Sequence, residues 1–225
     1  DKKVAKDVKK AILKNKKITK GIILDLRNNP GGLLDQAVGL VNLFVDDGVI
    51  VSQKGREKSD SKFYRADASS TVTDKPMVVL VNGGSASASE IVSGALQDHK
   101  RAVLVGEKTF GKGSVQVVLP INKTEAIKLT IARYYLPTGR TIQAVGVTPD
   151  IKVLPGEVKT YENEYTIKEA DLKEHLKKEL AKVETKKAKA KKKDKKDIIT
   201  PKMLNKDIQL KEAVDIIEAL AIIKG

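Results

Sequence analysis

A serine-rich turn is the first stretch of this 225-residue sequence whose residue types could do chemistry. It reads VNGGSASASE from Val81 to Glu90 and follows the apolar run 77–81, which predicts a strand. A strand that turns on two glycines into a helix presents a small hydroxyl at the helix N-terminus, where free N–H groups favour developing negative charge. Ser87 is therefore a candidate nucleophile. Ser87 and Glu90 also fit a capping box, so a purely structural helix cap is the alternative.

A serine nucleophile needs a general base, and neither histidine of the sequence suits that role. His99 would lie roughly 18 Å from Ser87 along the helix that Ser87 begins, and His175 lies in a charged region near the C-terminus. Cysteine is absent, so lysine is the remaining base. The best candidate is Lys112, which stands between two glycines at the entry to an expected strand. The alternative to a general base is that Lys112 is a turn residue whose amine lies in solvent.

Lysine acts as a base only in its neutral form, whereas the pKa of a lysine in water is about 10.4. Burial lowers that pKa, so we expect Lys112 to occupy a desolvated position. Gln116 lies four residues further along the same strand face, where its amide could hold the lysine amine by a hydrogen bond.

A second glycine pair, Gly31-Gly32, reads first as a turn. It could also present backbone N–H groups to an oxyanion, together with the N–H that follows the nucleophile. Two acids, Asp25 and Asp98, are expected to be buried or half-buried and to make structural hydrogen bonds.

The elements that must position these residues predict an α/β protein. Strand, Gly-Gly turn and helix recur at 21–44 and 77–97, which indicates parallel neighbouring strands. The strand 21–26 is apolar except for Asp25, so we expect it to be central and buried. A basic amphipathic helix is expected at 4–13. Further strands are expected at 49–52, 62–65, 102–106, 114–119 and 126–131.

The net charge of +14 suggests nucleic acid, but its distribution argues against that partner. Residues 1–20 carry nine Lys and two Asp, and residues 186–196 carry eight Lys and one Asp, which together account for the whole excess. Neither segment holds an aromatic residue that could stack on bases. We expect solvated charge runs without nucleic-acid binding. Lacking cysteine, clustered histidine and an EF-hand loop, the sequence predicts no metal and no cofactor.

Four motifs, in this order, resemble the carboxyl-terminal processing (tail-specific) proteases over roughly residues 1–153. They are LDLRNNPGG at 24–32, GSASASEI at 84–91, GEKTFGKGSVQ at 106–116 and GVTPD at 146–150. The resemblance implies that Ser87 is the nucleophile, Lys112 the general base and Gln116 the residue that orients the lysine. It implies that the backbone N–H groups of Gly32 and Ala88 form the oxyanion hole.

The resemblance also implies a fold, a reaction and a location. The fold would be a mixed α/β sheet with packed helices of the Clp/crotonase type. The reaction would be endopeptidase cleavage near protein C-termini through an acyl-enzyme, on the periplasmic or cell-envelope side of a bacterial inner membrane. Members of this family usually carry an upstream PDZ domain, and nothing in these residues resembles one. We therefore expect a protease-core fragment, whose lack of activity is one alternative.

Two further expectations concern organisation and partners. We divide the chain into a protease core at 1–155 and a helical appendage at 156–225 that contains the lysine-rich linker 186–196. The strongly apolar helix at 207–223 is expected to form a homodimer interface, the alternative being that it folds back on its own protomer. Two rival functions stay open: a non-catalytic peptide- or ligand-binding module on the same fold, and a membrane-surface protein acting through its lysine runs.

Overall fold

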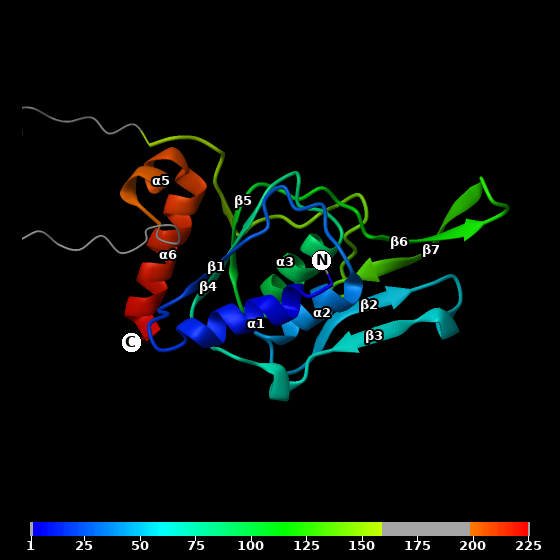
Figure 1. Ribbon diagram of the computed structural model, residues 1–225, viewed down its shortest axis with the longest axis horizontal. Coiled ribbons are helices and arrows are strands. Elements are labelled where there is room, and N and C mark those ends of the chain that lie inside the picture. The colour runs from blue at the N-terminus through cyan, green and yellow to red at the C-terminus, as the bar shows by residue number, and fades with distance from the viewer. Residues whose placement is uncertain (1, 159–198, 225) are drawn as a thin grey trace, which may run out of the picture.

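The computed structural model describes residues 2–158 and 199–224 of the chain. His175 and the lysine-rich linker 186–196 lie outside these residues. The helices are α1 (Val4–Asn15), α2 (Leu34–Asn42), α3 (Ala88–Asp98), α5 (Pro201–Lys206) and α6 (Ile208–Lys224), with short 3-10 turns at Lys58–Asp60 and Ala68–Ser70. The strands are β1 (Ile22–Asp25), β2 (Val49–Lys54), β3 (Lys62–Arg65), β4 (Met77–Val81), β5 (Val103–Gly106), β6 (Ser114–Pro120), β7 (Ala126–Tyr135) and β8 (Ile151–Lys152) (Figure 1).

Four parallel strands form the first sheet, in the order β1-β4-β5-β8. The register pairs Asp25 with Leu80, so the turns that follow β1 and β4 leave the same edge of the sheet as neighbours. These are the two Gly-Gly turns of the predicted strand-turn-helix units. The predicted parallel arrangement is confirmed, and it brings the two turns together.

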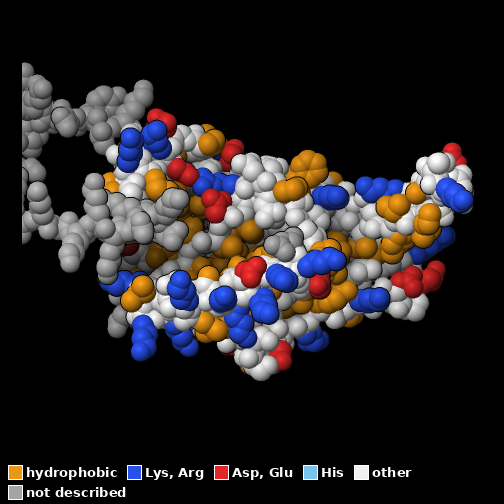
Figure 2. Space-filling view, in the orientation of Figure 1, with side chains coloured by type: hydrophobic (Ala, Val, Ile, Leu, Met, Phe, Trp, Pro, Cys, Tyr) orange, Lys and Arg blue, Asp and Glu red, His pale blue; other side chains and the backbone are white. Residues whose placement is uncertain are grey.

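The second sheet is antiparallel, in the order β3-β2-β7-β6. Beyond the residues of β7 that pair with β2, strands β6 and β7 continue as a two-stranded arm that projects from the body of the molecule (Figure 1). Aliphatic side chains remain exposed along this arm: Val118, Leu119, Ile127, Leu129 and Ile131. Figure 2 shows hydrophobic side chains on the surface of the arm. The lysines of α1 are also exposed, as expected of a solvated charge run.

Helices cover both faces of the parallel sheet because β4 is apolar at every position. Its side chains alternate: Met77, Val79 and Val81 join α2, α3 and β2 in the main core. Val78 and Leu80 point the other way and pack beneath α6. The result is the mixed α/β architecture that the sequence predicts, with β4 as its fully buried central strand.

One expectation about burial is wrong, and a second was left between two alternatives. Strand β1 is not central: it is an edge strand of the parallel sheet, only partly buried, and Asp25 is exposed. Helix α6 packs on its own protomer, which is the alternative that the sequence left open. Its Ala213 is fully buried against the protomer's own sheet, with Leu210, Ile216 and Ile217 packed around the same contact. This contact covers part of the apolar face of α6, whereas Ile222 and Ile223 at its end are exposed, and the homodimer stays a prediction.

The segment before α6 lies next to residues 156–158, where the first described range of the chain ends. The N–H of Val158 donates to the carbonyl of Asn205 at 2.8 Å, and the N–H of Ile208 donates to the carbonyl of Gly156 at 3.1 Å. The division at residue 155 stays a prediction, but α6 completes a layer of the core. Within the described ranges, no helix combines the length and apolarity needed to cross a membrane.

Candidate active site

Ser87 occupies the sharp turn between β4 and α3 and directly precedes the first helical residue. Its backbone has φ 55° and ψ −113°, a positive φ that a residue with a β-carbon rarely adopts. Such strain persists only where the surroundings impose it, and it is concentrated at functional sites. Ser87 is also partly exposed, so its hydroxyl can reach a ligand.

The two neighbouring serines are committed to structural bonds. The Ser85 hydroxyl donates to the carbonyl of Leu26 at 2.7 Å and is fully buried. The Ser89 hydroxyl donates to the carbonyl of Asn29 at 3.0 Å and is 3% exposed. Both bonds fasten the turn after β4 to the turn after β1. Of the three serines, Ser87 is the accessible one.

The turn after β1 approaches Ser87 at Gly31. This glycine has φ 105°, and a β-carbon there would lie 2.7 Å from the carbonyl oxygen of Ala86 and 3.0 Å from Cβ of Ser87. Only glycine fits this contact. Gly32 follows in open surroundings, and Ala88, as the first residue of α3, has an N–H without an intrahelical acceptor. The two predicted oxyanion donors therefore flank the nucleophile turn.

Glu90 is the hub of the site. Its side chain is fully buried, and each carboxylate oxygen accepts two hydrogen bonds, the acceptor capacity of an ionised carboxylate. Oε1 accepts from the Thr109 hydroxyl at 2.5 Å and the Gly111 N–H at 2.7 Å. Oε2 accepts from the N–H groups of Ser87 and Lys112, both at 2.8 Å. One carboxylate thus holds the backbone of the candidate nucleophile beside that of the candidate base.

A third motif is tied into this hub through Thr109. The Thr109 hydroxyl, besides donating to Glu90, accepts from the N–H of Val147 at 2.7 Å. Further along the same motif, the Asp150 carboxylate accepts from the N–H of Leu104 at 2.8 Å and from the Gln97 amide at 2.7 Å. The segments 106–116 and 146–150 therefore serve as a frame for the turn at Ser87.

The side chains of Lys112 and Gln116 depart from expectation. Both are exposed, so the predicted desolvated lysine is wrong for this conformation. The Gln116 amide donates to the Thr130 hydroxyl at 3.5 Å, across the β6–β7 arm. The reason is that β6 begins directly after the Lys112 turn and carries Gln116 out along the arm.

The remaining titratable candidates are structural. The His99 ring nitrogen Nε2 lies 2.8 Å from the carbonyl oxygen of Val49, so His99 joins α3 to β2 rather than reaching Ser87. Asp98 is half-buried as expected and binds Thr138 and Arg140. Asp25 is more exposed than expected and pairs with Arg27 at 2.7 Å. Among the described residues, no cluster of His, Asp or Glu could hold a metal ion.

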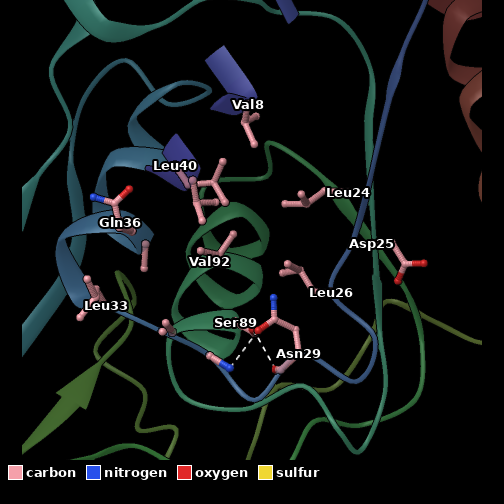
Figure 3. Close-up of a pocket in the computed structure, with 15 residues that line it drawn as sticks. Val8, Leu24, Asp25, Leu26, Asn29, Leu33, Gln36, Leu40, Ser89 and Val92 are labelled. Atoms are coloured by element: carbon pink, nitrogen blue, oxygen red, sulfur yellow. Dashed lines mark hydrogen bonds between the residues drawn. The ribbon is translucent and has the colours of Figure 1, made fainter. Parts of the chain in front are cut away.

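A cavity of about 380 Å³ opens next to the two glycine turns. Its walls carry apolar side chains from α1, β1, α2 and α3, including Val8, Leu24, Leu40 and Val92 (Figure 3). Gly31, Gly32 and Ala88 line the same cavity, so it adjoins the predicted oxyanion donors. Asp25 points away from the apolar group (Figure 3). The cavity suits an aliphatic side chain presented beside Ser87.

Sequence reasoning identified Ser87 and both glycine turns but missed two features. It read Glu90 only as a helix cap, although its carboxylate also binds donors about twenty residues later in the chain. It also missed Arg27, which binds Asp207 near the C-terminus at 2.7 Å. The capping-box pattern was a signal for the first, whereas no local pattern could have found the second.

Comparisons with known proteins agree with these motifs. The sequence pattern of peptidase family S41 matches residues 1–153. A carboxy-terminal-processing protease of Bartonella bacilliformis is 49% identical over 175 residues, covering 76% of this chain and 39% of that protein. The carboxy-terminal processing protease CtpA of Bacillus subtilis is 43% identical over 137 residues, covering 61% of this chain and 29% of that protein.

The solved structure of a photosystem II D1 C-terminal processing protease superposes with a TM-score of 0.63 at 37% identity. The match covers 68% of this chain and 40% of that one. A putative S41 protease from Bacteroides fragilis, 20% identical with a TM-score of 0.57, shows the same fold. This chain spans well under half the length of these relatives.

Proposed function

Because the chain belongs to peptidase family S41, we propose that it is a serine endopeptidase of the carboxyl-terminal processing type. Its substrates would be the C-terminal regions of proteins or peptides, cleaved on the periplasmic or cell-envelope side of a bacterial inner membrane. The observation that carries the proposal is the shared acceptor at Glu90. The N–H groups of Ser87 and Lys112 lie 2.8 Å from one oxygen, so the two backbones are held adjacent.

The proposed reaction proceeds through an acyl-enzyme. The neutral amine of Lys112 takes the proton of the Ser87 hydroxyl as Oγ attacks the scissile carbonyl carbon. The negative charge that develops on the carbonyl oxygen is stabilised by the N–H groups of Gly32 and Ala88. The carbon–nitrogen bond then breaks, and the lysine ammonium returns the proton to the leaving amine. Water, deprotonated by the same lysine, attacks the ester carbon. The ester carbon–oxygen bond breaks, the lysine ammonium returns the proton to Ser87 Oγ, and the product leaves with a new C-terminal carboxyl group.

Substrate binding has two tasks in this scheme. Lys112 is exposed to water in the chain alone. A peptide lying across the turn at Lys112 would exclude that water and favour the neutral amine. In the same proposal, Gln116 holds the amine once its bond to Thr130 is exchanged. The apolar cavity beside Gly32 supports the binding of an aliphatic substrate side chain next to the reacting carbonyl.

The test is cleavage of an unstructured peptide with a free C-terminus, followed by mass spectrometry of the products. Ser87→Ala should abolish cleavage, whereas Ser114→Ala, at a serine two residues beyond Lys112, should retain it. Acid quenching during turnover should reveal an acyl adduct on the peptide that contains Ser87. Cleavage by Ser87→Ala at the wild-type rate would refute the assignment.

A non-catalytic peptide-binding module is the second candidate. The exposure of Lys112 and Gln116, and the bond of the Gln116 amide to Thr130, favour it. In that case the wild-type chain and Ser87→Ala would bind the same peptide with equal affinity, and neither would cleave it.

A further inference from the structure

Arg27 links the turn after β1 to the C-terminal helices through a complete set of hydrogen bonds. Its Nε donates to Asp25, Nη1 donates to Asp207 and Gln209, and Nη2 donates to Asp25 and Asp207. All five guanidinium N–H donors therefore have acceptors, at distances between 2.7 and 3.0 Å. The Arg27 side chain is 17% exposed. A planar group with every donor used in two forked pairs has a fixed position.

The residues of the C-terminal helices that accept hydrogen bonds from Arg27 are held in place by further contacts. Gln209 is 2% exposed, and its amide donates onward to the carbonyl of Val153 at 2.7 Å. Asp207 also accepts from the N–H of Leu210 at 3.0 Å, as an N-cap of α6. The body of α6 is packed on the parallel sheet around the buried Ala213. These residues lie beyond residue 153, where the family match ends.

The turn that starts at Arg27 is bonded at successive residues to the turn at Ser87. Asn28 exchanges two hydrogen bonds with Asn82, at 2.9 and 3.0 Å. The carbonyl of Asn29 accepts from the N–H of Ala86 at 3.0 Å and from Ser89. Gly31 then touches Ser87 itself. The turn between Arg27 and Gly32 is thus in contact with the Ser87 turn at Asn28, Asn29 and Gly31.

From this continuous set of contacts we infer that Arg27 and Asp207 are positioning residues for the oxyanion donor Gly32, so that the C-terminal helices set the geometry of the active site. The inference rests on the proposed function for its catalytic consequence. Its structural part, the coupling of α6 to the turn 27–32, can be measured without activity. Both acidic partners are needed, because loss of Asp207 would leave two of the five guanidinium N–H groups without their present acceptors.

The experiment compares Asp207→Asn with Asp215→Asn in the full chain. Asparagine keeps the helix cap at 207 but removes the charge that pairs with Arg27. Asp215 lies on the same helix in an exposed pair with Lys211 and serves as the matched control. Hydrogen exchange measured by mass spectrometry should be at least about tenfold faster over residues 26–33 in Asp207→Asn. It should be unchanged over α3 in the same variant, and unchanged throughout in Asp215→Asn.

Steady-state cleavage of an internally quenched, unstructured peptide gives the catalytic readout. Asp207→Asn should lower kcat about tenfold and leave KM unchanged, because the donor is misplaced where charge develops. Unchanged exchange over 26–33 would overturn the inference. Faster exchange with an unchanged kcat would overturn the positioning role. If the wild-type chain cleaves nothing, the proposed function has failed, while the exchange result still decides whether α6 holds the turn.

Discussion

The backbone N–H groups of Ser87 and Lys112 donate to the same oxygen atom, Oε2 of the buried Glu90. This relationship fixes the main chain of the candidate nucleophile and the candidate base from one point. Both N–H groups are 2.8 Å from that oxygen, so loss of one acceptor would affect both residues together.

Glu90→Gln keeps the shape of the side chain but replaces one acceptor oxygen with an NH₂ group. In this fully buried site the NH₂ group would face backbone N–H groups, which are also donors, so the hydrogen bonds of those N–H groups would be lost. We expect the free energy of unfolding to fall by about 3 kcal/mol and kcat to fall at least about 100-fold. Urea denaturation and peptide cleavage measure the two effects. Glu57→Gln, at an exposed glutamate, should change neither; a Glu90→Gln variant of normal stability and turnover would contradict the hub role.

Lys112→Arg should be inactive although it keeps the positive charge. A guanidinium stays protonated at any pH at which the protein is folded, so it cannot accept the Ser87 proton. For the wild-type chain we expect kcat/KM to rise with pH, because only the neutral amine is a base and its fraction grows as pH increases. A pH–rate profile measures this limb. Turnover by Lys112→Arg within about threefold of wild type would exclude the lysine as the base.

Gly31→Ala and Gly32→Ala should differ although the residues are adjacent. At Gly31, φ is 105° and a β-carbon would meet the Ala86 carbonyl at 2.7 Å, so alanine there should destabilise the fold by about 3 kcal/mol. At Gly32 no atom lies within 4 Å of the added carbon, so the loss should stay below about 1 kcal/mol. Urea unfolding of both variants measures the two losses of stability. Equal losses would mean that the turn does not hold the observed conformation.

Acid should weaken the link between Arg27 and Asp207. Their hydrogen bond is the main reason that the pKa of Asp207 lies below its ordinary value, while burial works in the opposite direction. A carboxyl group with a lowered folded-state pKa stabilises the protein above its unfolded-state pKa, and that contribution disappears as pH falls through the folded-state pKa. We therefore expect wild type to be more stable than Asp207→Asn at about pH 6. The difference should vanish near about pH 2, as measured by urea unfolding; a difference independent of pH would contradict the ion pair.

The sequence predicted most of the fold because its strands and helices carry local signals. The apolar run at 77–81, the glycine pairs and the hairpin around 122–125 each specify a local structure, and each is present. The sequence left two partners open for α6, for a definite reason. An apolar face such as that around Ala213 shows that a surface must be covered, but periodicity does not say which surface covers it.

The site was predicted less completely than the fold. Ser87 and the glycine turns could be found because a strand-turn-helix pattern is local. The exposure of Lys112 could not be read from its flanking glycines, because exposure depends on where β6 leaves the body of the molecule. The Arg27–Asp207 pair joins residues 180 positions apart, beyond any sequence window. The roles of Ser87, Lys112, Gln116, Gly32 and Ala88 stay predictions.

The Val158 N–H and the Asn205 carbonyl are hydrogen-bonded at 2.8 Å, so the chain passes the same point of the core twice. A covalent connection between these two points needs to span only a short distance. We expect a short glycine-serine bridge in place of 159–198 to let α5 and α6 pack on the sheet as they do now, and urea unfolding of that variant measures it. The position of the C-terminal layer would then be set by its contacts with the core.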